Sequence, residues 1–304
     1  MSGFPDDFIL HLRANVAAAL EEDIRSLSPA LSPSRERGIE SRYAALTDND
    51  LTAQLIPANT LAQATVITRQ NAVLCGTDWF DECFRTLDAD CTITWLVSDG
   101  DLIKAGQTLC EISGQARGLL TAERSALNFL QLLSATATLT RQYVDAVQST
   151  AAKIMDTRKT IPGLRFAQKY AVRTGGGHNQ RMGLFDGILI KENHILAAGG
   201  IGPVLQQALR TAPAGTPVQI EVENIEQLRV ALDAGAKLVL LDNFELAQMR
   251  AAVELTAGRA ELEASGGITF QTVRAIAETG VNRISIGGLT KDVQAVDLSM
   301  RFVL

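Results

Sequence analysis

From residue 151 onward the chain repeats one pattern: an apolar stretch typical of a buried strand, then polar or glycine residues, then a helical pattern. Six strand-like segments carry it: KIMDTRK (153–159), GILIKENH (187–194), VQIEVEN (218–224), KLVLLDN (237–243), ELEASGG (261–267) and RISIGG (283–288). Strands that alternate with helices predict a parallel sheet with right-handed crossovers. We therefore predict an α/β barrel over residues 125–288, incomplete because six strands are clear where a closed barrel has eight.

Cations are concentrated in residues 156–196, although the whole chain is acidic, with a net charge of −6. In five of the six segments charged residues or paired glycines follow the strand, where α/β barrels place their chemistry. We expect four cations to converge over the barrel mouth: Arg158, Lys159, Arg181 and Lys191. Guanidinium groups suit carboxylates and phosphates, and lysine supplies a point charge. Arg165, Lys169 and Arg173 are spaced by four, so they belong either to this site or to a solvated helix face.

Two further groups of strand-end residues indicate bound phosphate and metal. Ser265-Gly266-Gly267 and Gly287-Gly288 follow the last two strands, where barrels often bind a phosphate through backbone N–H groups. Glu221 and Asp242 end adjacent strands and fit Mg²⁺ on a diphosphate or the stabilisation of a cationic transition state. The alternative for these carboxylates is a helix N-cap or a salt bridge to a neighbouring lysine. The two histidines of the cationic segment lack metal-ligand spacing, which argues against zinc.

The first 120 residues follow no clean βα repeat. A helix is expected over residues 6–25, and strands and hairpins over 64–76 and 91–114, where β-branched residues and an Asp-Gly turn occur. The four cysteines lack CxxC spacing and fit buried free thiols in a reducing cytosol. A pI near 5.2 argues against nucleic-acid binding, and no stretch reaches the roughly 18 apolar residues of a membrane span. The N-terminus lacks the basic region of a signal peptide.

The motifs, taken together and in order, resemble the quinolinate phosphoribosyltransferase family. The resemblance is carried by DTRKTIPGLRFAQKYAV, GGGHNQR, LIKENHI, EVEN, LDNF, ASGGI, ISIGGLTK and VDLSMRF, and upstream by DLTAQLIPANTLAQATVITRQNAVLCG and TAERSALNFLQLLS. It implies an α/β protein with an N-terminal open-faced α/β sandwich (residues 1–124 and 289–304) and an incomplete, seven-stranded α/β barrel (residues 125–288). The implied reaction converts quinolinate and phosphoribosyl pyrophosphate to nicotinate mononucleotide, pyrophosphate and CO₂ with Mg²⁺, in cytosolic NAD synthesis.

The resemblance also implies roles for single residues. Arg158 and Arg181 would hold the quinolinate carboxylates, with Lys159 and Lys191 in the same pocket. Arg124 would reach the site of a neighbouring subunit in a homodimer or an assembly of dimers. Glu221 and Asp242 would bind Mg²⁺ and the ribose. The 5′-phosphate would be bound by the two glycine loops, with Ser265, Gly266, Gly267, Gly287 and Gly288.

One position departs from the family pattern. Many members have histidine where this chain has Gln180, which carries no positive charge but still donates a hydrogen bond to a carboxylate. Lys291 stands where some members have histidine. Three other interpretations stay open. The first is a ModD-type phosphoribosyltransferase homologue with another substrate, the second a phosphate-binding barrel lyase with Lys159 or Lys191 as a Schiff-base lysine, and the third a non-catalytic carrier.

Overall fold

A computed structural model describes residues 8–24 and 49–303 of the chain. The chain forms two compact units, one of Met1–Thr138 with Val293–Leu304 and the other of Leu139–Asp292. The first division falls within the long helix α4 (Ala116–Ala146). The boundary expected after residue 124 lies within the same helix, and the one expected after residue 288 lies within α11 (Gly288–Lys291).

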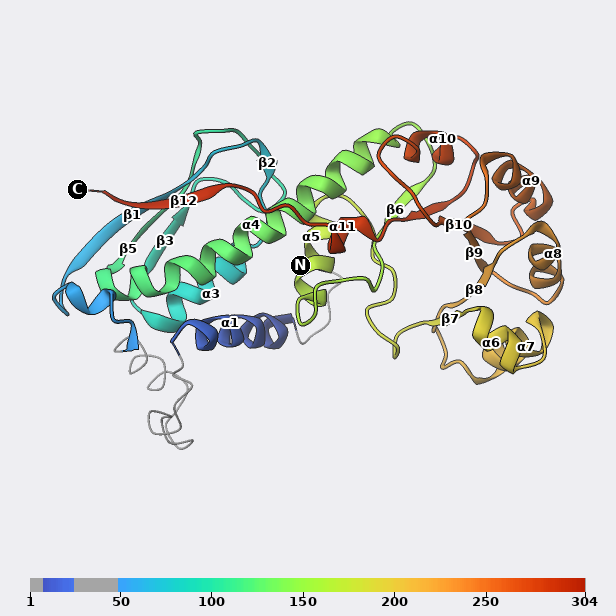
Figure 1. The fold of residues 1–304 in the computed structure, drawn as a ribbon, viewed down its shortest axis with the longest axis horizontal. Helices are drawn as coiled ribbons and strands as arrows, with labels where there is room; N and C mark the ends of the chain where they lie inside the picture. The colour runs from blue at the N-terminus through green and yellow to red at the C-terminus, as the bar shows by residue number, and fades with distance from the viewer. Residues whose placement is uncertain (1–7, 25–48, 304) are drawn as a thin grey trace. The chain divides into compact units, whose positions relative to one another are not determined.

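The first unit is built on an antiparallel sheet of four strands in the order β12 (Leu298–Val303), β1 (Leu61–Thr68), β5 (Thr108–Gln115) and β3 (Thr92–Trp95) (Figure 1). The C-terminal strand β12 pairs with β1, so the end of the chain completes the sheet of the first unit. A short pair, β2 (Ala72–Val73) with β4 (Leu102–Ile103), lies outside this sheet. The sheet and its helices confirm the sandwich that the motifs implied.

The helices of the first unit bury a regular apolar stripe. Helix α1 (Phe8–Ile24) buries a residue at every fourth position, from Phe8 to Ile24, as an amphipathic helix does. It packs on α3 (Thr77–Leu87), where the Phe8 and Trp79 rings meet edge to face with centroids 5.5 Å apart. A short 3₁₀ turn, η3 (Ala53–Leu55), precedes β1. All four cysteines are free and buried, as predicted.

The second unit contains a wholly parallel sheet of six strands. Their order is β6 (Lys153–Met155), β11 (Arg283–Ser285), β10 (Glu261–Ser265), β9 (Leu238–Asp242), β8 (Val218–Val222) and β7 (Ile188–Ile190). These are the six segments that the sequence predicts. Met155 pairs with Ser285 on one side and makes an isolated parallel bridge to His178 on the other. In the described part of the chain, the seventh strand of the expected barrel is therefore reduced to this bridge.

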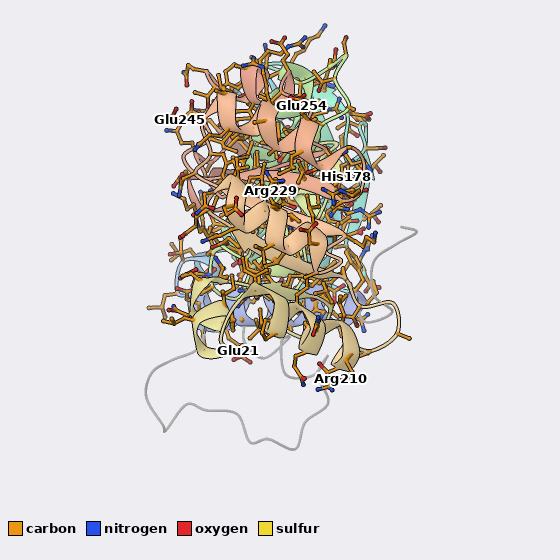
Figure 2. The ribbon with its side chains drawn as sticks, turned by 90° about the vertical axis from the view of Figure 1, so that its right-hand side faces the viewer. Glu21, His178, Arg210, Arg229, Glu245 and Glu254 are labelled. Atoms are coloured by element: carbon orange, nitrogen blue, oxygen red, sulfur yellow. The ribbon has the colours of Figure 1, made fainter. Side chains whose placement is uncertain are left out.

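Helices follow the strands of this sheet. They are α5 (Arg165–Thr174), α6 (Glu192–Ala197), α7 (Ile201–Thr211), α8 (Ile225–Asp233), α9 (Leu246–Thr256) and α10 (Val273–Ala277). Of these, α6 to α10 lie along the outer side of the sheet (Figure 1). Apolar strand residues such as Val239 and Leu241 form one core with Leu228 of α8 and Met249 of α9. The opposite faces of these helices carry exposed charges, such as Arg229 of α8 (Figure 2). No helix within residues 8–24 and 49–303 is long and apolar enough to span a membrane.

Candidate active site

The strand residues that do not face the helices point to the inner side of the sheet. Glu221 of β8 pairs in register with Leu240 of β9, and Asp242 pairs with Ser265 of β10. Successive side chains of a strand alternate between faces, so Glu221, Asp242 and Ser265 share the inner face. Their strands are parallel, which places these three groups toward the same edge. The register of the sheet therefore brings these strand-end side chains together, as predicted.

Lys191 and Glu221 form an ion pair at this edge. Lys191 Nζ lies 2.8 Å from Glu221 Oε2, with the lysine side chain 47% exposed and the glutamate 11%. Lys191 is also the N-cap of α6, where its backbone N–H donates to His194 Nδ1 at 3.0 Å. The alternative of a salt bridge to a neighbouring lysine is therefore realised at Glu221. Such a half-exposed pair contributes little to stability, and it leaves both groups able to turn to a ligand.

Arg158 and Arg181 bring two positive charges together on half-buried side chains. Burial and the nearby charge of Arg158 both lower the pKa of Arg181, while Asp186 opposes the shift. One Arg181 Nη1–H donates to the Gly187 carbonyl at 2.9 Å. Arg158 Nε is buried and has no hydrogen-bond partner in the described part of the chain. Like charges held together with an unused buried donor are stabilised by a bound anion, because it supplies the missing acceptor.

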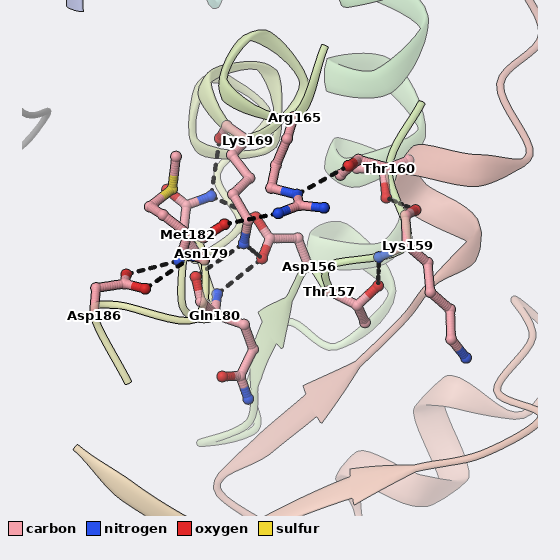
Figure 3. Close-up of polar contacts among 12 residues, drawn as sticks. Asp156, Thr157, Lys159, Thr160, Arg165, Lys169, Asn179, Gln180, Met182 and Asp186 are labelled. Carbon is pink, nitrogen blue, oxygen red and sulfur yellow. Dashed lines mark hydrogen bonds and ion pairs between the residues drawn. The ribbon is translucent and has the colours of Figure 1, made fainter. Parts of the chain in front are cut away.

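A buried ion pair joins Lys169 of α5 to Asp156, which follows β6 in the sequence (Figure 3). Both side chains are fully buried, and burial raises the pKa of Asp156 and lowers that of Lys169. Asp156 also accepts from Asn179 Nδ2 at 2.6 Å and from the Gln180 backbone N–H at 2.8 Å. Lys169 Nζ donates in addition to the Gln180 carbonyl at 2.9 Å. The pair therefore fastens the segment before Arg181 to the end of β6.

Lys169 corrects one expectation from the sequence. Of the cations spaced by four on α5, Arg173 is exposed and Lys169 is wholly buried, so they form neither a solvated stripe nor one convergent site. The available signal was the composition around Lys169, because Phe166, Ala167, Ala171 and Val172 leave few positions of this helix for solvent. Arg165 donates instead to Thr160 Oγ1 at 3.2 Å.

Lys159 lies beside the last glycine pair. A Cβ added to Gly287 would come 3.1 Å from Lys159 Cδ, so the two segments are in close contact. The Lys159 carbonyl accepts from Thr290 Oγ1 at 2.8 Å, which fixes its backbone. Figure 3 shows the Lys159 ammonium pointing away from the Lys169–Asp156 pair. One predicted cation and one predicted phosphate loop therefore meet at this corner of the sheet.

The other glycine loop requires an unusual backbone. Gly266 has a φ of +100°, and an added Cβ would come 2.0 Å from Asn243 Oδ1. Asn243 itself has a φ of +55°, and its N–H donates to the Ser265 carbonyl at 2.9 Å. The ends of β9 and β10 are therefore in close backbone contact, which only glycine permits at position 266.

Gly266→Ala is expected to destabilise the protein by about 1–3 kcal/mol for the strained φ alone, plus the displacement of Asn243. Gly235→Ala is the matched control, because Gly235 has a φ of +93° with open space around its Cβ position. Urea unfolding of both variants separates the two costs. Equal losses in the two variants would contradict a role for the Asn243 contact.

Mg²⁺ fits the acidic pair only with help from a ligand. Within the described residues no group of three or more histidine, cysteine, aspartate or glutamate side chains is arranged to hold a metal. Asp242 Oδ2 accepts from Asn243 Nδ2 at 2.9 Å, and Glu221 is paired with Lys191. Mg²⁺ commonly takes one or two carboxylates together with substrate phosphates and waters. Glu221 and Asp242 suit that mode of binding.

One predicted residue has a neighbour that the sequence did not indicate. Gln180, expected to bind substrate, directs its Nε2 to both carboxylate oxygens of Glu263 at 2.5 Å. Glu263 lies within the strand segment 261–267 but was not among the predicted site residues. Arg124 is exposed on α4 in the first unit. Its expected role in a neighbouring subunit's site stays a prediction, because the structure contains one chain.

A parallel sheet with cations, carboxylates and glycine loops at its strand ends defines a class of protein: an α/β-barrel enzyme that acts on anionic substrates. Family profiles identify the family. Quinolinate phosphoribosyl transferase, C-terminal domain, matches residues 136–301, and the N-terminal domain of the same enzyme matches residues 50–134. The chain belongs to the quinolinate phosphoribosyltransferase family, which confirms the resemblance seen in the motifs.

Individual relatives agree. The chain is 41% identical over 255 residues to the probable nicotinate-nucleotide pyrophosphorylase [carboxylating] of Bacillus subtilis, covering 84% of this chain and 88% of that protein. It is 38% identical to quinolinate phosphoribosyltransferase [decarboxylating] 2b, mitochondrial, of Nicotiana tabacum, covering 81% and 75%. The solved nicotinate-nucleotide pyrophosphorylase of Francisella tularensis superposes with a TM-score of 0.86 at 41% identity, covering 99% and 98% of the two chains.

Proposed function

We propose that this protein transfers the phosphoribosyl group of phosphoribosyl pyrophosphate to quinolinate and releases CO₂, giving nicotinate mononucleotide and pyrophosphate in NAD biosynthesis. The observation that carries the proposal is the Arg158–Arg181 pair with its unused buried Nε–H. A dicarboxylate on a small ring supplies two anionic acceptors for two guanidinium forks. Membership of the family and the names of the relatives support the same reaction.

The charged groups at the strand ends suit both the binding of quinolinate and the transfer of the phosphoribosyl group. Arg158 and Arg181 hold the two carboxylates and orient the ring nitrogen toward the anomeric carbon. That nitrogen forms the new C–N bond, while the C–O bond to diphosphate breaks and its electron pair leaves with the diphosphate. Glu221 and Asp242 stabilise the positive charge that develops on the ribose, and Lys159 and Lys191 neutralise the departing group. Ser265, Gly266, Gly267, Gly287 and Gly288 cradle the 5′-phosphate.

Decarboxylation follows from the new bond. The ring nitrogen becomes positively charged, so the electron pair of the adjacent C–CO₂ bond can remain on the ring carbon, which then takes a proton. Mg²⁺ held by Glu221, Asp242 and the diphosphate would supply Lewis-acid stabilisation of the leaving group. Removal of Mg²⁺ is therefore expected to abolish turnover.

We further propose a homodimer in the cytosol, with Arg124 contributed to the partner's site. The exposed position of Arg124 and the four free cysteines support these two points. The Schiff-base alternative is not favoured at Lys191, because the Glu221 carboxylate stabilises the charged, non-nucleophilic form of its amine. At Lys159 the alternative is tested by the borohydride experiment below.

The proposed function is tested by incubating the protein with quinolinate, phosphoribosyl pyrophosphate and Mg²⁺. We expect nicotinate mononucleotide and CO₂ in equal amounts, and neither product when EDTA is present or nicotinate replaces quinolinate. Turnover of phosphoribosyl pyrophosphate with another acceptor, and none with quinolinate, would instead support a phosphoribosyltransferase of different substrate. Borohydride trapping with a carbonyl substrate would support the lyase.

A further inference from the structure

Glu263 is a buried carboxyl in the middle of β10, 1% exposed, two residues before the Ser265 loop. Its oxygens accept from Gln180 Nε2 at 2.5 Å and from Gln219 Nε2 at 3.1 Å, and Ser285 of β11 hydrogen-bonds to it as well. These donors are neutral. Burial raises the pKa of Glu263. The charge of Arg283 lowers this pKa, but Arg283 Nε donates to Glu261 at 2.6 Å. An acid placed here has a desolvation cost that an apolar residue would avoid.

The contacts of Gln180 indicate what this acid does. Its backbone N–H donates to Asp156 and its carbonyl accepts from Lys169, so both main-chain groups are held by the buried ion pair. Its side-chain amide donates to Glu263 and also lies 3.2 Å from Gln219 Oε1. Gln180 is therefore held at three points inside the second unit. The next residue is Arg181, so the direction in which that guanidinium leaves the backbone is set by these contacts.

We propose that Glu263 is a positioning residue: through the Gln180 side chain it fixes the turn that presents Arg181 to the substrate carboxylate, and Gln180 is not itself a substrate ligand. The inference rests on the proposed function, because it concerns the quinolinate carboxylates. In this proposal the Gln180 side chain binds Glu263 on the inner face of the sheet and not the substrate, which the sequence had led us to expect. The contact with Gln180 also gives a role to a buried acid whose desolvation is costly and whose hydrogen-bond donors are neutral.

A double-mutant cycle tests the coupling. Gln180→Ala, Glu263→Gln and the double variant are compared with wild type by KM for quinolinate, KM for phosphoribosyl pyrophosphate, kcat and urea unfolding. Glu263→Gln keeps the volume of the side chain but places an amide NH₂ against donors. Glu261→Gln is the matched control, on the same strand with its side chain 47% exposed.

Each single change is expected to raise the KM for quinolinate by about 10- to 100-fold, because a small misplacement of Arg181 weakens binding strongly. The KM for phosphoribosyl pyrophosphate should change less than about threefold, and the double variant should be no worse than the worse single one. A purely structural role would reduce the stability and the active fraction and leave both KM values unchanged. Effects that multiply in the double variant would overturn the proposal.

A crystal structure of the wild-type protein with quinolinate gives a test that needs no variant to fold. We expect Gln180 Nε2 to stay on Glu263 with the ligand bound, and a Gln180 side chain turned onto a quinolinate oxygen would overturn the inference. The two proposals fail in different ways. Wild-type protein that does not use quinolinate refutes the proposed function, and the inference falls with it. Active wild type with independent Gln180 and Glu263 refutes the positioning role alone.

Discussion

Arg158→Ala is expected to lower kcat/KM for quinolinate by about 30-fold or more, while the ligand-free protein keeps its stability. Removal of one partner from a charge-assisted contact typically costs about 2–5 kcal/mol, and each 1.4 kcal/mol is about tenfold. In the ligand-free protein, however, Arg158 Nε has no partner among the described residues, and its charge acts against that of Arg181. Loss of Arg158 removes this repulsion and leaves no acceptor unsatisfied at Nε.

The combination of lost activity and retained stability separates a ligand-binding arginine from a structural one. Steady-state kinetics and urea unfolding give the two readouts. Arg158→Lys keeps the charge but loses the planar fork, so it should recover only part of the activity. Arg210→Ala is the control, because Arg210 is exposed on α7 at the outer surface (Figure 2). Near-normal kinetics for Arg158→Ala would refute the assignment of the dicarboxylate site.

The sequence predicts the second unit well because its information is local and repeated. Each of the six strands is an apolar run that ends in polar or glycine residues. Because the strands are parallel, all of these ends lie at the same edge of the sheet. The seventh strand was not visible because it is a single bridge at His178, which has no apolar run. The family motifs identified the activity, while the chemistry of the strand ends alone indicated only an anionic substrate.

The sequence could not show which partners the buried polar residues meet. Lys169 and Glu263 are of types that usually lie at the surface. Lys169 is paired with Asp156, and Glu263 with Gln180 and Gln219, which are distant from it in the sequence. Such contacts depend on the register of the sheet and on the helix rotation, which no local pattern encodes. The role of Arg124 depends on a second chain and stays a prediction.

Lys169→Met is expected to be the most destabilising single change in the second unit, by about 3–5 kcal/mol. Loss of one partner of a buried ion pair leaves the other charge buried and uncompensated. Lys169 and Asp156 are both fully buried, so solvent does not screen the pair. The segment that precedes Arg181 would also lose the contact from Lys169 Nζ to the Gln180 carbonyl. Activity should therefore fall with stability in this variant, unlike in Arg158→Ala.

The destabilisation should depend on pH with a definite sign. Lys169 lowers the pKa of Asp156, which burial already raises above its ordinary 3.8, so its loss raises that pKa further. The folded variant then binds a proton that the unfolded chain has released, and stability falls as pH rises through this range. Unfolding free energies measured at several pH values between about 4 and 8 should show that the difference between Lys169→Met and wild type widens toward neutral pH.

Lys237→Met, at an exposed lysine, is the control, and its unfolding free energy should differ from that of wild type by a small amount that does not change with pH. The double variant Lys169→Met/Asp156→Asn removes the unpaired carboxylate. If it is as unstable as Lys169→Met alone, the destabilisation comes from packing and not from that carboxylate.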